Sequence, residues 1–253
     1  MNAAPVILGY FVPIILVVIL FVLFKVERPS LPVFERPQTE VRTALFLFAI
    51  LGVIVVVSAA VLKPVHDTSN LTTASMAYSS LLYAVFLLPF IAALVVRRQG
   101  LHTCLIPRKG VLFHLTVSIA MGFFSIPVYL LAVGKISMLP YALSNLFTVS
   151  SLFFLVPILM EEFIFRGFLL TRFTAGLGKH KGVLLSAVMF GLYHYPRYLL
   201  SSHMGFLETT QIVILIIAVS VGGGYGIYSI RCMFYGVFIH WCMDIVQTSI
   251  PPR

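Results

Sequence analysis

Charged residues are scarce in this chain of 253 residues. Asp, Glu, Lys and Arg together make up 10% of it, whereas a typical soluble domain carries roughly 25%. Hydrophobic residues make up 60%. This composition excludes an ordinary soluble domain and leaves no room for a separate soluble domain beside the apolar segments. The chain is therefore predicted to be a polytopic membrane protein.

Cysteine and acidic residues are also few. The three cysteines are an odd number, and two of them lie inside apolar runs, so they do not indicate a disulfide framework. Seventeen Lys and Arg outnumber eight Asp and Glu, which gives a net charge of +9. The basic residues stand between apolar blocks, where lipid headgroups and membrane topology explain them better than nucleic acid does. We expect membrane lipids as partners and no nucleic acid.

Long apolar runs fill most of the chain. A hydrocarbon core of roughly 30 Å takes about 20 residues per helix, and runs such as Ile14 to Phe24 lack the alternation that a β-barrel requires. The sequence therefore predicts an all-α membrane bundle of about eight transmembrane helices. No repeat or linker is evident, so residues 1–253 are predicted to form a single integral membrane domain. The expected spans are 6–24, 44–62, 74–96, 111–133, 146–170, 182–200, 212–230 and 232–250.

The basic residues are distributed unevenly between the predicted connections. Segments 25–43, 97–110 and 171–181, together with Arg231, hold 12 of the 17 Lys and Arg, whereas the alternate segments hold 4, including Arg197 in the connection 197–211. Because basic residues favour the cytoplasmic side, both termini are expected on the other side. The first span has no basic residue before it, unlike a cleavable signal peptide, so it is expected to remain in the protein.

Three acidic residues lie inside predicted spans. An ionisable residue at bilayer depth costs roughly 2.5–3.5 kcal/mol on insertion scales, so its presence there indicates function by default. Glu161 and Glu162 fall in the fifth span and Asp244 falls in the eighth. The remaining acidic residues are expected in loops or beside the start of a span; they are Glu27, Glu35, Glu40, Asp67 and Glu208.

The spacing of these residues indicates chemistry. Glu162 and Arg166 are four residues apart and share a helix face, so they can form the ion pair that makes their burial tolerable. Glu161 points about 100° away and has no local partner, which makes it a candidate general base. His194 and His240 supply imidazoles at a similar depth: at about 1.5 Å per residue from the cytoplasmic helix ends, Glu161, His240 and His194 lie about 13, 12 and 18 Å deep.

Three short motifs occur in order along the last spans. They are Glu161-Glu162-x-x-x-Arg166, Phe190-x-x-x-His194 and His240-x-x-x-Asp244. Their order resembles that of the CAAX prenyl protease and bacteriocin-processing (CPBP, or ABI) intramembrane proteases, and the similarity covers roughly residues 146–250. The resemblance implies a fold like that of type II CAAX prenyl endopeptidases, in which the helices enclose a water-accessible cavity open to the cytoplasm.

The resemblance also implies roles for the motif residues. Glu161 with His194 would bind and activate a water molecule, and His240 with residue 244 would stabilise the oxyanion. Glu162 and Arg166 would support them.

Residue 244 departs from the motif, because many relatives have Asn where this chain has Asp244. A carboxylate repels an oxyanion unless it is protonated or hydrogen-bonded to His240. Asp244 is therefore also interpreted as a residue that orients His240 and holds it cationic.

No cofactor is expected, with a metal as the alternative. Zinc or another divalent ion could be bound by Glu161, His194, His240 and Asp244. The His-Glu-x-x-His motif of common zinc peptidases is absent from the sequence.

The predicted function is a glutamate-type intramembrane endopeptidase that acts on a peptide or a prenylated protein, with C-terminal prenylated CAAX sequences as the substrate that the resemblance suggests. Two alternatives remain open. A proton-coupled transporter would also place Glu, His and Asp at depth and would show flux driven by a pH gradient. A bacteriocin self-immunity protein would have the motifs without catalysis.

Overall fold

A computed structural model describes residues 3–61, 73–202 and 204–249. These residues form helices and no strand, which confirms the all-α class. A 3₁₀ turn, η3 (Leu101–Cys104), precedes α5, and a second one, η4 (Ile136–Met138), precedes α6; two π-helical segments, η5 (Glu162–Leu169) and η6 (Arg197–Ser201), follow α7 and α9. The α-helices are α1 (Ala3–Leu23), α2 (Pro37–Val61), α3 (Thr73–Phe86), α4 (Leu88–Val96), α5 (Val111–Ala132), α6 (Leu139–Leu146), α7 (Val149–Glu161), α8 (Leu170–Leu177), α9 (Lys179–Pro196), α10 (Phe206–Ile230) and α11 (Phe234–Ser249).

Each of the eight predicted spans overlaps a helix, but the count of eight spans is not confirmed. In the described part of the chain α1, α2, α5 and α10 are long and apolar enough to cross a membrane. A fifth span results if Ile136–Leu146 and Val149–Leu177, which meet at 83°, are taken together. The third predicted span is broken at Leu87, before Pro89, whose ring cannot continue the helical hydrogen bonds. Residues 62 and 250 of the predicted spans lie outside the described residues, as do Asp67 and both termini.

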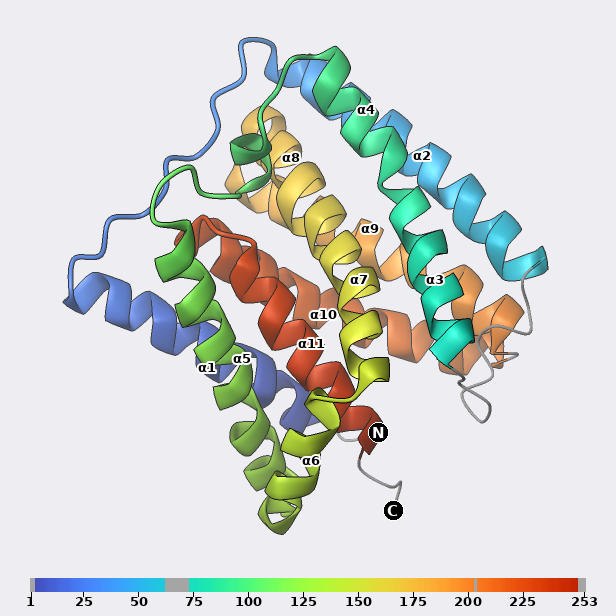
Figure 1. Cartoon of the computed structure of the whole chain (residues 1–253). Coiled ribbons are helices and arrows are strands. Elements are labelled where there is room, and N and C mark those ends of the chain that lie inside the picture. The colour runs from blue at the N-terminus through green and yellow to red at the C-terminus, as the bar shows by residue number, and fades with distance from the viewer. Residues whose placement is uncertain (1–2, 62–72, 203, 250–253) are drawn as a thin grey trace.

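The helices that carry the motifs lie within the bundle. Helix α11 packs against α5, α7 and α1, α3 packs against α7, and α9 packs against α8 and α10 (Figure 1). The outer helices expose large apolar side chains instead of polar ones. Examples are Ile15 and Val22 on α1, Phe46 and Val53 on α2, and Ile214 on α10. Such surfaces suit lipid better than water, and the chain is an integral membrane protein.

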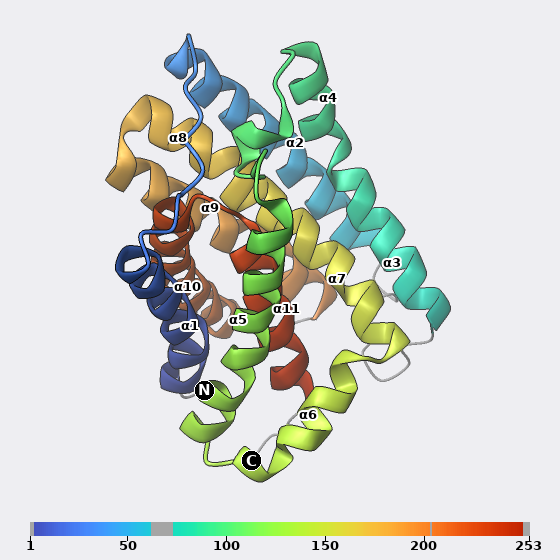
Figure 2. The ribbon, with the colours of Figure 1, turned by 60° about the vertical axis from the view of Figure 1, so that its left-hand side comes forward.

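The four basic connections lie at the same end of the bundle. They follow α1, α4, α8 and α10, and both views place them together, opposite the connection between α5 and α6 (Figures 1 and 2). The alternation of basic and non-basic connections in the sequence therefore corresponds to two ends of one helical bundle.

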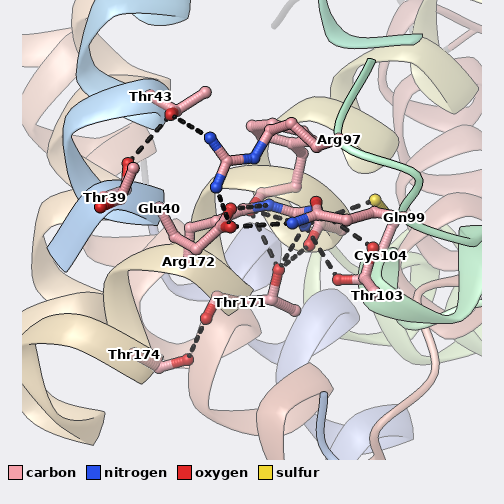
Figure 3. A network of polar contacts seen from close by, with 12 residues as sticks. Thr39, Glu40, Thr43, Arg97, Gln99, Thr103, Cys104, Thr171, Arg172 and Thr174 are labelled. Carbon is pink, nitrogen blue, oxygen red and sulfur yellow. Dashed lines mark hydrogen bonds and ion pairs between the residues drawn. The ribbon is translucent and has the colours of Figure 1, made fainter. Parts of the chain in front are cut away.

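A buried polar network ties three helices together near the basic end (Figure 3). The sequence predicted Glu40 in a loop and Arg172 in a connection, and both predictions were wrong. Glu40 lies in the first turn of α2 and is 3% exposed, and Arg172 lies in α8 and is fully buried. Arg97, at the end of α4, forms an ion pair with Glu40, and the Nε atom of Arg172 lies 3.7 Å from the other oxygen of that carboxylate.

Arg172 also holds η3 against α8. Its guanidinium donates to the carbonyl of Thr103 at 2.9 Å and to Oε1 of Gln99 at 2.7 Å, and it lies 3.8 Å over the ring of Phe168. The thiol of Cys104 is 3.6 Å from the same guanidinium. Burial raises the pKa of the Cys104 thiol, so the thiol stays neutral and Glu40 balances the charge of Arg172. Full burial of an arginine is tolerated here because both terminal nitrogens donate hydrogen bonds and the Glu40 carboxylate balances the charge, although Nε has no hydrogen-bond partner among the described residues.

Candidate active site

Helix α7 reaches the site through a proline. Pro157 has no N–H, so the carbonyl of Phe153, four residues earlier, loses its helical partner. The hydroxyl of Ser80 on α3 donates to that carbonyl at 2.9 Å. Helix α7 then ends at Glu161, and the π-helical segment η5 begins at Glu162. A π-helical segment has one extra residue in its turn compared with an α-helix, which changes the direction of the side chains, and such segments are frequent at functional sites.

Glu162 is the centre of a buried charge cluster. Its Oε1 atom lies 3.3 Å from Nη1 of Arg166, so the ion pair predicted from their spacing is present. The same oxygen accepts a hydrogen bond from Nδ1 of His240 at 3.0 Å. The guanidinium of Arg166 also lies 3.9 Å over the ring of Phe190, in the second motif. Glu162 is 2% exposed and Arg166 is 8% exposed, so each buried charge has an opposite charge beside it.

The other ring nitrogen of His240 faces two further carboxylates. Nε2 lies 3.5 Å from Oδ2 of Asp244 and 4.0 Å from Oε2 of Glu161. The second oxygen of Asp244, Oδ1, accepts a hydrogen bond at 3.3 Å from the hydroxyl of Tyr10 on α1. The two oxygens of Asp244 therefore have different partners. Tyr10 also packs edge-on against the ring of His240, with centroids 6.1 Å apart.

His194 is held by its own helix. Its Nδ1 atom lies 2.7 Å from the carbonyl oxygen of Phe190. A carbonyl can only accept, so Nδ1 donates, and in the neutral ring Nε2 carries the lone pair. The ring stacks on Tyr198 at 6.2 Å and packs edge-on against Phe190 at 4.7 Å. Its orientation is thus fixed on several sides.

One cavity of about 360 Å³ joins these helices. Six motif side chains line it, whereas Glu162, which contacts the far side of the His240 ring, does not. The six are Glu161, Arg166, Phe190, His194, His240 and Asp244. Apolar side chains of α7 and α10 form much of the remaining wall. The structure therefore brings together all four residues that were predicted to be catalytic.

The cavity extends away from the basic connections. Its lining includes Val6 near the start of α1, Phe153 near the start of α7, Ile212 near the start of α10 and Thr248 at the end of α11. These helix ends are the ones opposite the basic connections (Figures 1 and 2). The positive-inside expectation and the expected cytoplasmic opening of the cavity therefore point to different ends of the bundle.

The alternative metal site depends on how its four donors are arranged. Across residues 3–61, 73–202 and 204–249, no three His, Cys, Asp or Glu side chains are grouped closely enough to hold a metal ion. Glu161 and Asp244 approach His240, whereas His194 turns its Nδ1 atom to a backbone carbonyl.

Residues 142–246 match the family model described as Type II CAAX prenyl endopeptidase Rce1-like. This region of the chain is Rce1-like. The match confirms the resemblance that the three motifs suggested, and it contains all of them. The family is one of CAAX-type intramembrane proteases, which are peptide hydrolases. No curated protein and no solved structure matches the chain.

Three residues outside the motifs belong to the site and were missed in the sequence. Tyr10 and Ser80 precede the Rce1-like region, and each sits in an apolar run where its hydroxyl gives no signal of its own. Arg197 was assigned to a connection, but it begins η6 and lines the cavity. Its position three residues after His194, on the same helical surface, was the available signal.

Proposed function

We propose that this protein is an intramembrane endopeptidase of the CAAX prenyl protease type, which hydrolyses a peptide bond with a water molecule activated by Glu161 and His194. One observation carries the proposal: within an Rce1-like region, Glu161, His194, His240 and Asp244 come from three separate helical segments and line one cavity. A peptide or a prenylated protein is the proposed substrate, and the apolar wall of the cavity suits a lipid-bearing peptide.

The proposed reaction uses Glu161 as the general base. A water molecule donates one hydrogen bond to the Glu161 carboxylate and another to Nε2 of His194. The water oxygen attacks the scissile carbonyl as its proton passes to Glu161, and Glu161 then delivers that proton to the leaving amine. His240 acts as the imidazolium cation in this proposal: its Nδ1 atom donates to Glu162, and its Nε2 atom therefore also carries an N–H, which donates to the oxyanion of the tetrahedral intermediate.

Glu162 and Arg166 act by positioning His240. Glu162 accepts the hydrogen bond from Nδ1 at 3.0 Å and so fixes the orientation of the ring. Arg166 balances the charge of Glu162 at 3.3 Å, which keeps the carboxylate in place inside the bundle.

Asp244 is proposed to orient His240, not to donate to the oxyanion. Its Oδ2 atom faces Nε2 of His240 at 3.5 Å, and the Tyr10 hydroxyl holds Oδ1 at 3.3 Å. A carboxylate constrained in this way is less free to turn toward the oxyanion and repel it. Tyr10 is a positioning residue in this account.

Removing the Tyr10 hydroxyl is expected to slow cleavage in a way that depends on residue 244. Tyr10→Phe preserves the ring packing and should lower kcat by about tenfold, which corresponds to one lost hydrogen bond of about 1.4 kcal/mol. In an Asp244→Asn background the same change should cost less than about threefold, because a neutral amide has no charge to constrain. The measurement is a double-mutant cycle on kcat and KM. Equal losses in both backgrounds would show that Tyr10 acts only through packing.

Gly236 leaves the space that the Glu162 carboxylate occupies. A Cβ atom at position 236 would lie 2.1 Å from Oε2 of Glu162 and 2.9 Å from its Cδ atom. Gly236→Ala is therefore expected to displace Glu162 from His240 and to lower kcat by about 100-fold, the usual consequence of a 1 Å misplacement. Gly223→Ala on α10 is the matched control, because a Cβ atom there meets nothing within 4 Å. An active Gly236→Ala variant would contradict the proposed role of Glu162.

The direct test is cleavage of a fluorogenic farnesylated CAAX peptide by the purified full-length protein in detergent. The proposal expects cleavage that a strong chelator leaves unchanged. If cleavage is lost with chelator and recovers with zinc, a bound metal ion, and not Glu161 alone, activates the water molecule. A well-folded protein that cleaves neither this peptide nor its unprenylated form would overturn the proposed activity. Proton-driven flux in vesicles would then support a carrier.

The orientation in the membrane is a separate part of the proposal. The four basic connections favour the cytoplasm at their end, and the cavity lining extends toward the opposite end. We propose that the basic connections face the cytoplasm, so that substrate reaches the cavity from the other side of the bundle. This differs from the cytoplasmic opening that the family resemblance suggested.

Cysteine labelling distinguishes the two orientations. The native thiols are buried; burial raises the pKa of the Cys104 thiol and raises that of Cys232 to about 12, so they should not react with maleimide in the folded protein. Thr248→Cys at the cavity end should label with an impermeant maleimide in intact cells that hold the protein in their plasma membrane. Lys109→Cys in a basic connection should label only after permeabilisation. If Lys109→Cys labels in intact cells and Thr248→Cys labels only after permeabilisation, the cavity opens to the cytoplasm as the family resemblance suggested.

A further inference from the structure

Arg197 is a cation of the cavity that forms no ion pair with any of the described residues, although its charge is felt by Glu161 across the cavity. It lies in η6, one turn after His194, and its side chain lines the cavity with Glu161 and Asp244. In the described part of the chain, no hydrogen bond or ion pair joins its guanidinium to another side chain. An arginine cannot lose its proton, so a guanidinium inside a helical bundle requires an anion or water.

Other arginines within the bundle have such an anion. Arg166 is paired with Glu162, and both Arg97 and Arg172 are paired with Glu40. Arg166 also lines the cavity, but its charge is balanced by Glu162. Arg197 is thus the cavity arginine of this region that remains available to a negatively charged ligand.

Arg197 also lies where two cavities meet. A smaller cavity of about 40 Å³ is enclosed by apolar residues of α2 and α3, including Val55 and Leu82. Tyr83, His194 and Arg197 line both cavities. A peptide chain that passes His194 on this side therefore meets the guanidinium of Arg197 next, beside a small apolar recess.

We propose that Arg197 binds the free C-terminal carboxylate of the peptide substrate and so selects the bond that is presented to Glu161 and His194. The inference rests on the proposed peptidase function. Every peptide with a free terminus supplies one carboxylate whatever its sequence, and the planar guanidinium can bind both of its oxygens. Glu161 and Asp244 repel a carboxylate from the rest of the polar lining, which leaves the side of the cavity near Arg197 for the C-terminal end of the peptide.

The test compares two farnesylated fluorogenic peptides that differ only in a C-terminal carboxylate or carboxamide. The wild-type full-length protein should cleave the acid with a kcat/KM about 30-fold higher than the amide, mostly through KM, as expected for loss of one partner of a partly buried charge pair. Arg197→Gln should abolish the preference, so that the acid and the amide are cleaved with the same kcat/KM. Arg197→Lys should retain part of the preference. Arg108→Gln, at an exposed loop position, is the matched control and should behave as wild type.

The outcomes separate this inference from the proposed function. If the wild type cleaves both peptides equally, or if Arg197→Gln slows both by the same factor, Arg197 does not bind the terminal carboxylate although the peptidase activity stands. If the wild type cleaves neither peptide, the proposed function and this inference both fail. A preference for the acid that persists in Arg197→Gln would assign the carboxylate to another residue.

Discussion

Glu161→Gln is expected to reduce kcat by about 1000-fold while the protein keeps its thermal stability, because general-base catalysis contributes about 100- to 10,000-fold. Glutamine has nearly the same shape and can still accept a hydrogen bond from water, but it cannot take up the proton. Glu161 is 5% exposed, and among the described residues its nearest ion-pair partner is His240 at 4.0 Å, so its neutral replacement leaves little uncompensated charge. The measurement is single-turnover cleavage of the farnesylated peptide.

His194 provides the internal check on this result. If Glu161 and His194 activate the same water molecule, the effects of their substitutions on kcat should not add, because the two residues act as one unit. The double variant Glu161→Gln/His194→Ala should then be at most about tenfold slower than Glu161→Gln. Glu208→Gln, at an exposed position of α10, is the matched control and should keep wild-type activity. Substantial cleavage by Glu161→Gln would remove Glu161 from the mechanism.

Arg166→Met is expected to destabilise the protein by about 3–5 kcal/mol, the usual cost of leaving one buried charge without its partner. The variant leaves Glu162 without the guanidinium that balances its charge. Glu162 is 2% exposed, and its Oε2 atom already has no hydrogen-bond partner among the described residues. Thermal or denaturant unfolding of the detergent-solubilised protein measures the loss. Wild-type stability in this variant would show that the bundle can rearrange to hydrate Glu162.

The double variant Glu162→Leu/Arg166→Met separates stability from catalysis. Replacing a buried ion pair with apolar residues of similar volume is often neutral, so most of the lost stability should return. Cleavage should stay low, because Nδ1 of His240 loses the carboxylate that it contacts at 3.0 Å. A double variant that regains full activity would limit Glu162 to a structural role.

Several features of the site followed from local spacing. Glu162 and Arg166 were predicted to pair because four residues make one helical turn, and their atoms lie 3.3 Å apart. His194, His240 and Asp244 were singled out because polar residues inside apolar runs are costly, and all three line the same cavity. The family resemblance came from the same motifs and is confirmed over residues 142–246.

Other predictions failed where a residue's environment is formed by distant segments. Glu40 and Arg172 were expected outside the bundle, but 131 intervening residues fold so that they meet in its interior. Arg197 was assigned to a connection because a basic residue near a helix end is usually solvated, although its position three residues after His194 places both side chains on one helical surface. The count of about eight spans is not confirmed: among the described residues four helices, or five spans with one bent pair, are long and apolar enough to cross a membrane. Apolar composition alone does not separate a membrane-crossing helix from a shorter helix buried in the bundle.

The sequence by itself determined that this protein lies in a membrane, that it is helical, and which residues form the candidate site. A content of 60% hydrophobic residues requires a membrane. Inside a membrane the backbone hydrogen bonds must be satisfied within the protein, which a helix does. A few charged residues in apolar runs mark the candidate site. Only the tertiary structure decided which partners those charges have. Tyr10 donates a hydrogen bond to Asp244, and Glu162 accepts one from His240, whereas Arg197 has no ion-pair partner in the described residues. The physical reason is that helix periodicity governs contacts within one turn, whereas the contacts between helices depend on how their side chains pack around a shared cavity.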